Sequence, residues 1–166
     1  MHYQTARLSV HPLTDADESA VIELLTDPVV KKTYMVPDFP SREDAAKLFL
    51  RLKSLSQTEN RYVAGIYLDE MLIGILNETE VTGGTIELGY AILSRYHNKG
   101  YGTEMLSGAI SYLFENGFDE ILTGAFSGNQ ASIRIMIKCG MQKLDRQEEI
   151  EYRGKTHRCI FYSVRK

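Results

Sequence analysis

Apolar residues recur along the chain with two different periods, which predicts a mixture of strands and helices. Between residues 85 and 93 the spacing is two, as in a strand. Ile86, Leu88, Tyr90 and Ile92 fall on one face of this expected strand. The opposite face is unusually bare and carries Glu87, Gly89, Ala91 and Leu93.

A helical period follows the strand. Gly100 and Gly102 separate the two patterns, and Gly117 is expected to end the helix in a left-handed conformation. Leu122–Phe126 then predicts another strand, and Ser127–Ser132 leads into a second helix. Apolar positions of the first helix are Met105, Leu106, Ala109, Ile110, Leu113 and Phe114.

The rest of the chain divides into similar elements. The pairs Thr14–Asp17 and Asp27–Pro28 should open and close a helix, and Ser41–Asp44 resembles the capping box of another. Residues 31–40, with two prolines, predict an ordered loop of limited freedom. The strand, helix and strand over 85–126 form one βαβ unit, so its two strands should be parallel. Further strands are expected over 5–10, 62–68, 71–77 and 78–81, with a C-terminal hairpin of 148–152 and 156–164.

The segment His97–Met105 combines features that bind phosphate. A helix start leaves backbone N–H groups without partners and carries positive partial charge. Gly100 and Gly102 would let the chain approach a pyrophosphate closely, and Lys99 adds a positive charge. A plain turn is the competing interpretation. A dinucleotide fingerprint fits poorly because Met105 occupies its third small position, and no Gly-Lys-Ser or Gly-Lys-Thr occurs for a Walker loop.

This segment also resembles the phosphate loop of the GNAT acyltransferases, in the branch similar to the RimJ and RimL N-terminal acetyltransferases. That loop reads Gln or Arg, two residues, Gly, one residue, and Gly or Ala, which here are His97, Gly100 and Gly102. The first position departs from the pattern, but main-chain N–H groups do most of the binding. A second block adds Asn129, Ser132 and the ending Lys138-Cys139-Gly140-Met141. The start, Thr5–Leu13, is also similar, with His11 in place of a usual arginine.

The resemblance implies an α/β (α+β) fold with a mixed, mostly antiparallel central sheet. One splayed parallel strand pair, flanked by helices, would hold acetyl-CoA in a V-shaped gap. The pantetheine arm would then form β-like hydrogen bonds along the strand that ends at Leu93. The implied coenzyme-binding residues are Ala91, Ile92, Leu93, His97, Asn98, Lys99, Gly100, Tyr101, Gly102, Thr103 and Asn129.

The resemblance also implies direct acetyl transfer to an amine in a ternary complex. Glu87, on the bare face, is the candidate proton acceptor. An exposed glutamate at the strand edge or a structural ion pair explains it equally well, and a strand register shifted by one residue would turn it away from the site. Many relatives protonate the leaving thiolate with a tyrosine, but Met136 stands at that position. Ser132 lies one helical turn earlier and is the candidate to hydrogen-bond the sulfur or relay a proton to it. The competing interpretation is a serine with a structural role at the start of the helix. Asn129 would bind pantetheine or simply cap its helix.

Length and charge agree with this interpretation. The 166 residues are expected to form one domain, 1–166. A net charge of −3 and a pI near 5.8 argue against a nucleic-acid partner. Cys139 and Cys159 suggest reduced thiols, and the four histidines are too scattered for a metal site. No signal peptide or membrane-spanning run is apparent, so we expect a cytoplasmic protein without membrane association.

The leading hypothesis is an acetyl-CoA-dependent N-acetyltransferase. Its acceptor would be a primary amine, either a protein or peptide N-terminus or a small molecule such as an amino sugar, polyamine or amino acid. The altered loop at His97 and the missing tyrosine at Met136 also allow a degenerate domain that senses acyl-CoA without turnover. A structural domain that only retains the fold is a third hypothesis. The sequence leaves open whether the chain forms a homodimer.

Overall fold

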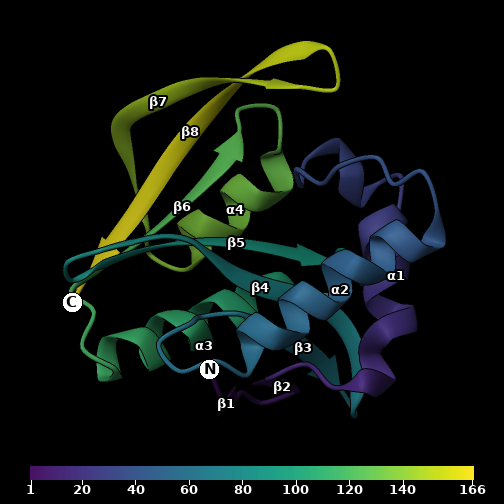
Figure 1. The fold of residues 1–166 in the computed structure, drawn as a ribbon. Coiled ribbons are helices and arrows are strands. Elements are labelled where there is room, and N and C mark those ends of the chain that lie inside the picture. The colour runs from purple at the N-terminus through teal and green to yellow at the C-terminus, as the bar shows by residue number, and fades with distance from the viewer.

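A mixed sheet of eight strands forms the centre of the computed structural model, which describes residues 1–166. Its strand order is β1-β2-β3-β4-β5-β6-β8-β7, and only β5 and β6 run parallel. The expected mixed, mostly antiparallel sheet is therefore confirmed (Figure 1). The strands are β1 (Tyr3–Gln4), β2 (Leu8–His11), β3 (Ala64–Leu68), β4 (Met71–Thr82), β5 (Thr85–Ile92), β6 (Glu120–Phe126), β7 (Gln142–Tyr152) and β8 (Lys155–Arg165).

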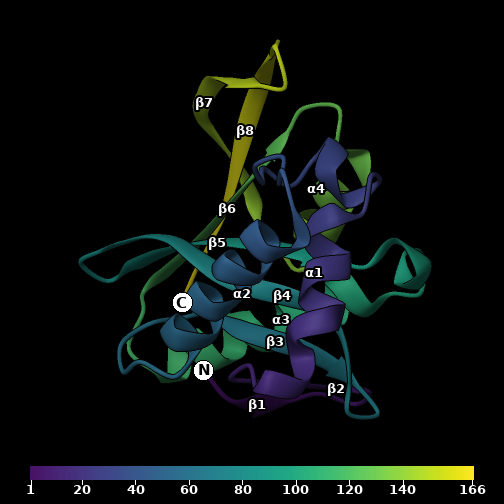
Figure 2. The same cartoon turned by 45° about the vertical axis from the view of Figure 1, so that its right-hand side comes forward.

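Helices cover both faces of this sheet. Helices α3 and α4 pack their apolar side chains against one face, and α1 and α2 pack theirs against the other. Figure 2 shows α1 and α2 in front of the strands and α3 behind them. The helices are α1 (Glu18–Thr26), α2 (Arg42–Ser56), α3 (Tyr101–Glu115) and α4 (Gln130–Lys138), and short 3₁₀ turns occupy Asp15–Asp17, Val30–Lys32 and Ser94–Tyr96.

Local capping explains where the first two helices begin. The Ser41 side chain accepts a hydrogen bond from the Asp44 N–H, 3.2 Å away, so the expected cap of α2 is confirmed. Thr14 and Asp17 form a capping box, but the chain makes one 3₁₀ turn there before α1 begins. Helix α1 ends at Thr26, directly before the predicted stop.

Three element boundaries differ from the sequence-based predictions. Strand β4 is continuous through the expected break after Asn77, because a bulge around Thr79 lets its pairing with β5 continue. Helix α3 begins at Tyr101, so Gly102 lies inside its first turn. The hairpin begins at Gln142, and a register shift follows Lys143.

The parallel strands β5 and β6 separate part-way along their length. They pair from Thr85 to Leu88 on β5 and from Glu120 to Thr123 on β6. Beyond Leu88 no β6 residue pairs with β5, and Figure 1 shows β6 rising away from it toward the β7–β8 hairpin. The splayed pair is therefore confirmed, and one edge of β5 is left open over its last residues.

Candidate active site

A cleft of about 670 Å³ opens where β5 and β6 separate. Its walls come from the end of β5, the segment before α3, the first turns of α4, the β7–β8 hairpin and residues 30–35. Segments far apart in the sequence therefore meet here. A cleft of this size is typical of a site for a small molecule or a cofactor.

The phosphate-loop candidate lines one end of the cleft. Gly100 has φ of +83° and is the N-cap of α3, and Asn98 also has a positive φ of +60°. The first backbone bond of the helix runs from the Glu104 N–H to the Gly100 carbonyl. The N–H groups of Tyr101, Gly102 and Thr103 have no hydrogen-bond partner within the protein. These donors, at the positive end of the helix, form a site for an anion.

The structure requires glycine at position 102 for a different reason than at position 100. Gly102 lies in helical conformation inside α3, and a Cβ there would lie 2.6 Å from Cδ1 of Ile135. The glycine therefore lets α3 approach α4 closely rather than making the turn. Close approach of the backbone, which the sequence suggested for both glycines, comes at this position from helix packing.

Positive charge near the loop comes from more residues than Lys99. The Lys99 ammonium lies 5.4 Å from the centre of the Tyr96 ring and outside the cleft wall. Arg134 and Lys138 of α4 do line the cleft. Sequence reasoning missed both, although their spacing of four residues places them on one helical face.

An ion pair ties the loop to the N-terminal strands. Arg7 Nε lies 2.7 Å from Glu104 Oε2, and Arg7 Nη1 donates to the Lys99 carbonyl at 3.2 Å. Glu104 also accepts from the Thr5 hydroxyl at 2.6 Å. Burial alone would raise the pKa of Glu104, but the hydrogen bonds from Thr5 and Arg7 hold this pKa below its usual value. The carboxylate is therefore charged at neutral pH and anchors Arg7 beside the loop.

The end of β5 offers fewer groups to the cleft than the sequence suggested. The Leu93 N–H donates to the Ile73 carbonyl on β4, and the Leu93 side chain is buried against the α1 and α2 layer, outside the cleft wall. Alternate residues of a strand direct their backbone N–H and C=O groups to the same edge, so the backbone groups of Ala91 also point to β4. The backbone groups of Tyr90 and Ile92 point to the open edge of β5. Leu93 is covered on its face of the strand, whereas Glu87, Gly89 and Ala91 of the same face line the cleft.

His97 lines the cleft, and its ring is already engaged. Its Nε2 donates to the Ile92 carbonyl oxygen, 2.7 Å away. This bond connects the loop to the open edge of β5, and it engages the carbonyl oxygen of Ile92 as its acceptor. The Ile92 N–H remains directed to that edge.

The first turn of α4 brings together the candidate residues near the sulfur. The Asn129 side chain caps α4 by accepting from the Ser132 N–H at 3.2 Å, and both residues line the cleft. The Ser132 hydroxyl lies 2.8 Å from the Tyr90 hydroxyl of β5. Met136, at the usual tyrosine position, is fully buried in the core between α4 and the sheet. Ser132 is thus directed to the cleft, whereas the side chain at 136 is not.

Glu87 lines the cleft but sits in an ion pair. Its carboxylate accepts from the Thr79 hydroxyl and from Arg146, both at 3.0 Å. Arg146 also binds Glu148 at 2.7 Å and lies 3.9 Å from the centre of the Phe161 ring. The sequence could not indicate Arg146 or Glu148, because the hairpin bulge that places them near β5 follows from the fold.

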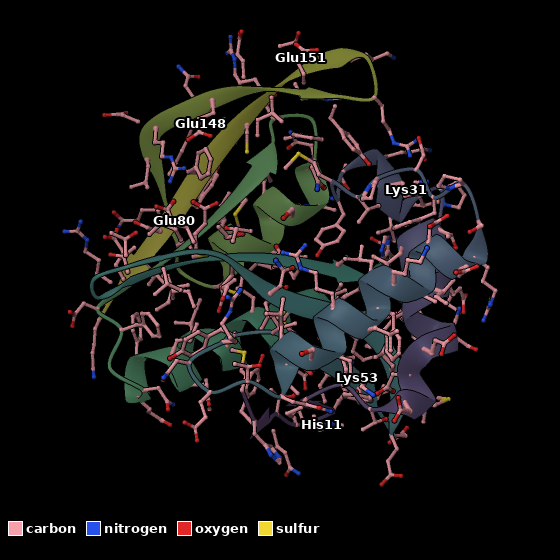
Figure 3. All side chains as sticks on the ribbon, viewed as in Figure 1. His11, Lys31, Lys53, Glu80, Glu148 and Glu151 are labelled. Atoms are coloured by element: carbon pink, nitrogen blue, oxygen red, sulfur yellow. The ribbon has the colours of Figure 1, made fainter.

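Thr33, Tyr34 and Met35, within the segment 31–40, line the opposite wall of the cleft. The Tyr34 hydroxyl donates to the Asn77 side-chain oxygen at 2.6 Å, and the Tyr152 hydroxyl lies 2.9 Å from the Lys31 carbonyl. Burial raises the pKa of Tyr34, so its hydroxyl keeps its proton. Figure 3 shows Lys31 on this segment and Glu148 on the hairpin across from it. The hairpin and the loop together enclose the side of the cleft away from α3.

Comparison with known proteins agrees with this geometry. The model of the acetyltransferase (GNAT) domain matches residues 7–142. The chain belongs to the GNAT family. GNAT proteins are acetyl-CoA-dependent acyltransferases, and the sequence-based assignment to this family is therefore confirmed.

Individual GNAT relatives extend over almost the whole chain. The uncharacterized N-acetyltransferase YoaA of Bacillus subtilis is 27% identical over 158 residues, which cover 92% of this chain and 89% of YoaA. A GNAT acetyltransferase from Bacillus anthracis has the same fold, with a TM-score of 0.85 and 23% identity, covering 99% of this chain and 98% of its own. RimL, a ribosomal L7/L12 alpha-N-protein acetyltransferase solved with coenzyme A, has a TM-score of 0.85 at 15% identity, with coverage of 99% and 98%. The resemblance to the RimL-like branch is thus confirmed in the fold.

Several features of the cleft would suit coenzyme A. Its free N–H groups at α3, with Arg134 and Lys138, suit the phosphates, and the open edge of β5 suits an amide-containing arm. A Cβ at Gly100 would lie 3.3 Å from Nη2 of Arg7, the residue that anchors the loop. No helix of this GNAT chain has the length and apolar composition that spanning a bilayer requires.

The thiols of this GNAT chain are free. Cys139 is half-buried and Cys159 is buried, and no disulfide joins them. Burial raises the pKa of each to about 11, so both stay protonated at neutral pH.

We expect Arg7→Ala to weaken acetyl-CoA binding to this GNAT protein by roughly fivefold, because the loop loses its anchor at Lys99 and Glu104 while the free N–H groups remain. Calorimetric titration measures the affinity, and thermal unfolding should change little. Arg165→Ala is the matched control. Arg165 of β8 forms an ion pair with Glu120 of β6 at 3.1 Å, and both residues lie outside the cleft wall. Equal affinities for Arg7→Ala and the wild-type protein would show that the anchor does not serve the loop.

Proposed function

We propose that residues 1–166 form one GNAT domain that transfers acetyl from acetyl-CoA to a primary amine, with a protein N-terminal α-amine as the acceptor. The observation that carries this proposal is the single cleft that joins the α3 N-terminus to Ser132 and Glu87. An anionic coenzyme suits one end of this cleft. A carboxylate at the other end suits an amine.

The choice of an α-amine rests on two considerations. RimL, which has the same fold, is an alpha-N-protein acetyltransferase. In addition, roughly a quarter of α-amines are neutral near pH 7.4, against about one lysine amine in a thousand, given their ordinary pKa values. Glu87 already binds Arg146. An acceptor amine that is partly neutral in solution does not need this carboxylate to deprotonate it before it attacks.

In the proposed reaction the loop and α4 hold the coenzyme phosphates, and the pantetheine arm lies along residues 90–92. Asn129 borders this arm while it caps α4. A neutral amine nitrogen attacks the thioester carbonyl, and Glu87 accepts its proton, directly or through water. Ser132 donates to the sulfur as the C–S bond breaks and its electron pair goes to sulfur.

The test is an acetylation assay with peptides that carry a free α-amine. Three versions of one peptide are compared: free N-terminus without lysine, blocked N-terminus with lysine, and blocked N-terminus without lysine. The proposal expects thiol release from acetyl-CoA with the first, and mass spectrometry should place one acetyl group on the N-terminus. Release only with the lysine peptide, or only with small amines, would contradict the α-amine acceptor. Binding without release for any amine would favour an acyl-CoA sensor.

Glu87→Gln is expected to lower kcat by roughly a hundredfold and to leave acetyl-CoA affinity nearly unchanged, because the amide keeps the size but cannot accept the proton. Steady-state kinetics across pH, with calorimetry for the affinity, measure both effects. An unchanged rate across pH would remove Glu87 from the catalytic role.

A matched variant separates proton acceptance from the ion pair. Glu148→Gln also removes a carboxylate from Arg146, while Glu87 stays intact. If Glu87 only holds Arg146, the two variants should lose activity equally. A far greater loss for Glu87→Gln supports its role as the proton acceptor.

A further inference from the structure

Two hydroxyl groups face each other on the wall of the cleft. The Tyr90 hydroxyl of β5 and the Ser132 hydroxyl of α4 lie 2.8 Å apart, and both residues line the cleft. Neither hydroxyl has another hydrogen-bond partner within the protein. Tyr90 stands two residues beyond Leu88, the last residue of β5 that pairs with β6. The pair therefore spans the point where the strands have separated.

Either hydroxyl of the pair can donate to the other. A phenol is a stronger acid than an aliphatic alcohol, which favours the Tyr90 O–H as the donor and the Ser132 oxygen as the acceptor. Burial raises the pKa of Tyr90 to about 12, so this proton is present throughout the neutral range. The pair holds two protons, and only one lies between the oxygens. The other, on Ser132, is free to point into the cleft.

We propose that Tyr90 is a positioning residue, whose hydroxyl orients the Ser132 hydroxyl so that its proton is directed to the sulfur of coenzyme A. This inference rests on the proposed function, in which Ser132 serves the sulfur. As the C–S bond breaks, the electron pair goes to sulfur, and the thiolate accepts the Ser132 hydrogen bond. The amine proton leaves toward Glu87 or water, so Tyr90 keeps its own proton and no further reactant is needed.

The arrangement accounts for the methionine at position 136. Met136 is fully buried and offers no polar hydrogen to the cleft. Tyr90 places its phenol near the same helix from the neighbouring strand, and it acts through Ser132. A hydroxyl donor that accepts a second hydrogen bond is also a better donor, because hydrogen bonds in a chain polarise one another.

The first measurement uses coenzyme A itself and needs no turnover. The pKa of the bound thiol is followed by thiolate absorbance for the wild-type protein, Tyr90→Phe, Ser132→Ala and the double variant. A hydrogen bond to the thiolate lowers the pKa of the thiol, so this pKa should rise in both single variants. The double variant should show no greater rise than Ser132→Ala, because both residues act on the sulfur through one bond.

The second measurement is acetyl transfer by the same variants. Tyr90→Phe is expected to lower kcat by roughly tenfold, with the KM for acetyl-CoA within about twofold of wild type. Tyr62→Phe is the matched control, since its ring packs edge-on against Phe118 and its hydroxyl has no partner. The control should leave both the thiol pKa and kcat unchanged.

The outcomes separate this inference from the proposed function. A thiol pKa that is the same in Tyr90→Phe and wild type overturns the role of Tyr90, whatever the turnover. A shifted thiol pKa in a protein that acetylates no amine supports the Tyr90–Ser132 pair and contradicts the proposed reaction. Additive losses of kcat in the double variant would also overturn the inference, because the two residues would then act independently.

Discussion

Gly100→Val is expected to weaken acetyl-CoA binding by roughly tenfold to a hundredfold, because a β-branched residue at φ of +83° costs about 1–3 kcal/mol of backbone strain. Relief of this strain would turn the loop away from the three free N–H groups at the start of α3. The new side chain would also press on Arg7, since even a Cβ lies 3.3 Å from its Nη2. Calorimetric titration measures the affinity directly.

Gly117→Val is the control for strain alone. Gly117 follows the other end of α3 with φ of +92°, and a Cβ there meets no atom within 4 Å. Both variants should therefore lose similar stability in thermal unfolding, and only Gly100→Val should lose the coenzyme. Equal acetyl-CoA affinities for the two folded variants would contradict the loop as the phosphate site.

Ser132→Ala is expected to lower kcat by roughly a hundredfold, because the leaving sulfur loses a hydrogen bond that forms fully only as charge develops on it. The Asn129 cap should persist, since it binds the Ser132 backbone N–H rather than the hydroxyl. Acetyl-CoA affinity and thermal stability should stay close to wild type. Steady-state kinetics with a saturating amine measure kcat.

Ser111→Ala is the comparison for losing a helical hydroxyl. The Ser111 hydroxyl donates to the Ser107 carbonyl of the same exposed helix surface, away from the cleft. This variant should keep full activity. A wild-type kcat in Ser132→Ala would remove the serine from the reaction, and a loss of α4 stability would point to a structural role instead.

Periodic patterns predicted the parts of the fold that depend on local sequence. The alternation before Leu93, the Ser41 cap and the glycine after α3 all correspond to elements of the structure. Boundaries were missed where tertiary pairing decides them. No glycine or proline lies beside Thr79 to mark the bulge. The local sequence therefore gave no sign that β4 continues through this point.

The sequence predicted the glycine loop of the candidate site, but it did not predict the side-chain contacts around Glu87 and Ser132. Gly100 and the helix start are local features, and their spacing indicated an anion site. The partners of Glu87 and Ser132 lie 59 and 42 residues away, at Arg146 and Tyr90. Such contacts follow from the separation of β5 and β6 and from the hairpin bulge, which no local pattern encodes.

Calorimetric titration with acetyl-CoA, alongside NAD and ATP at moderate salt, tests the central claim most directly. The account predicts selective binding of acetyl-CoA, at one molecule per chain, with a loss of affinity in Gly100→Val and not in Gly117→Val. No binding to a demonstrably folded protein, or equal binding of all three nucleotides, would contradict a coenzyme site in this cleft.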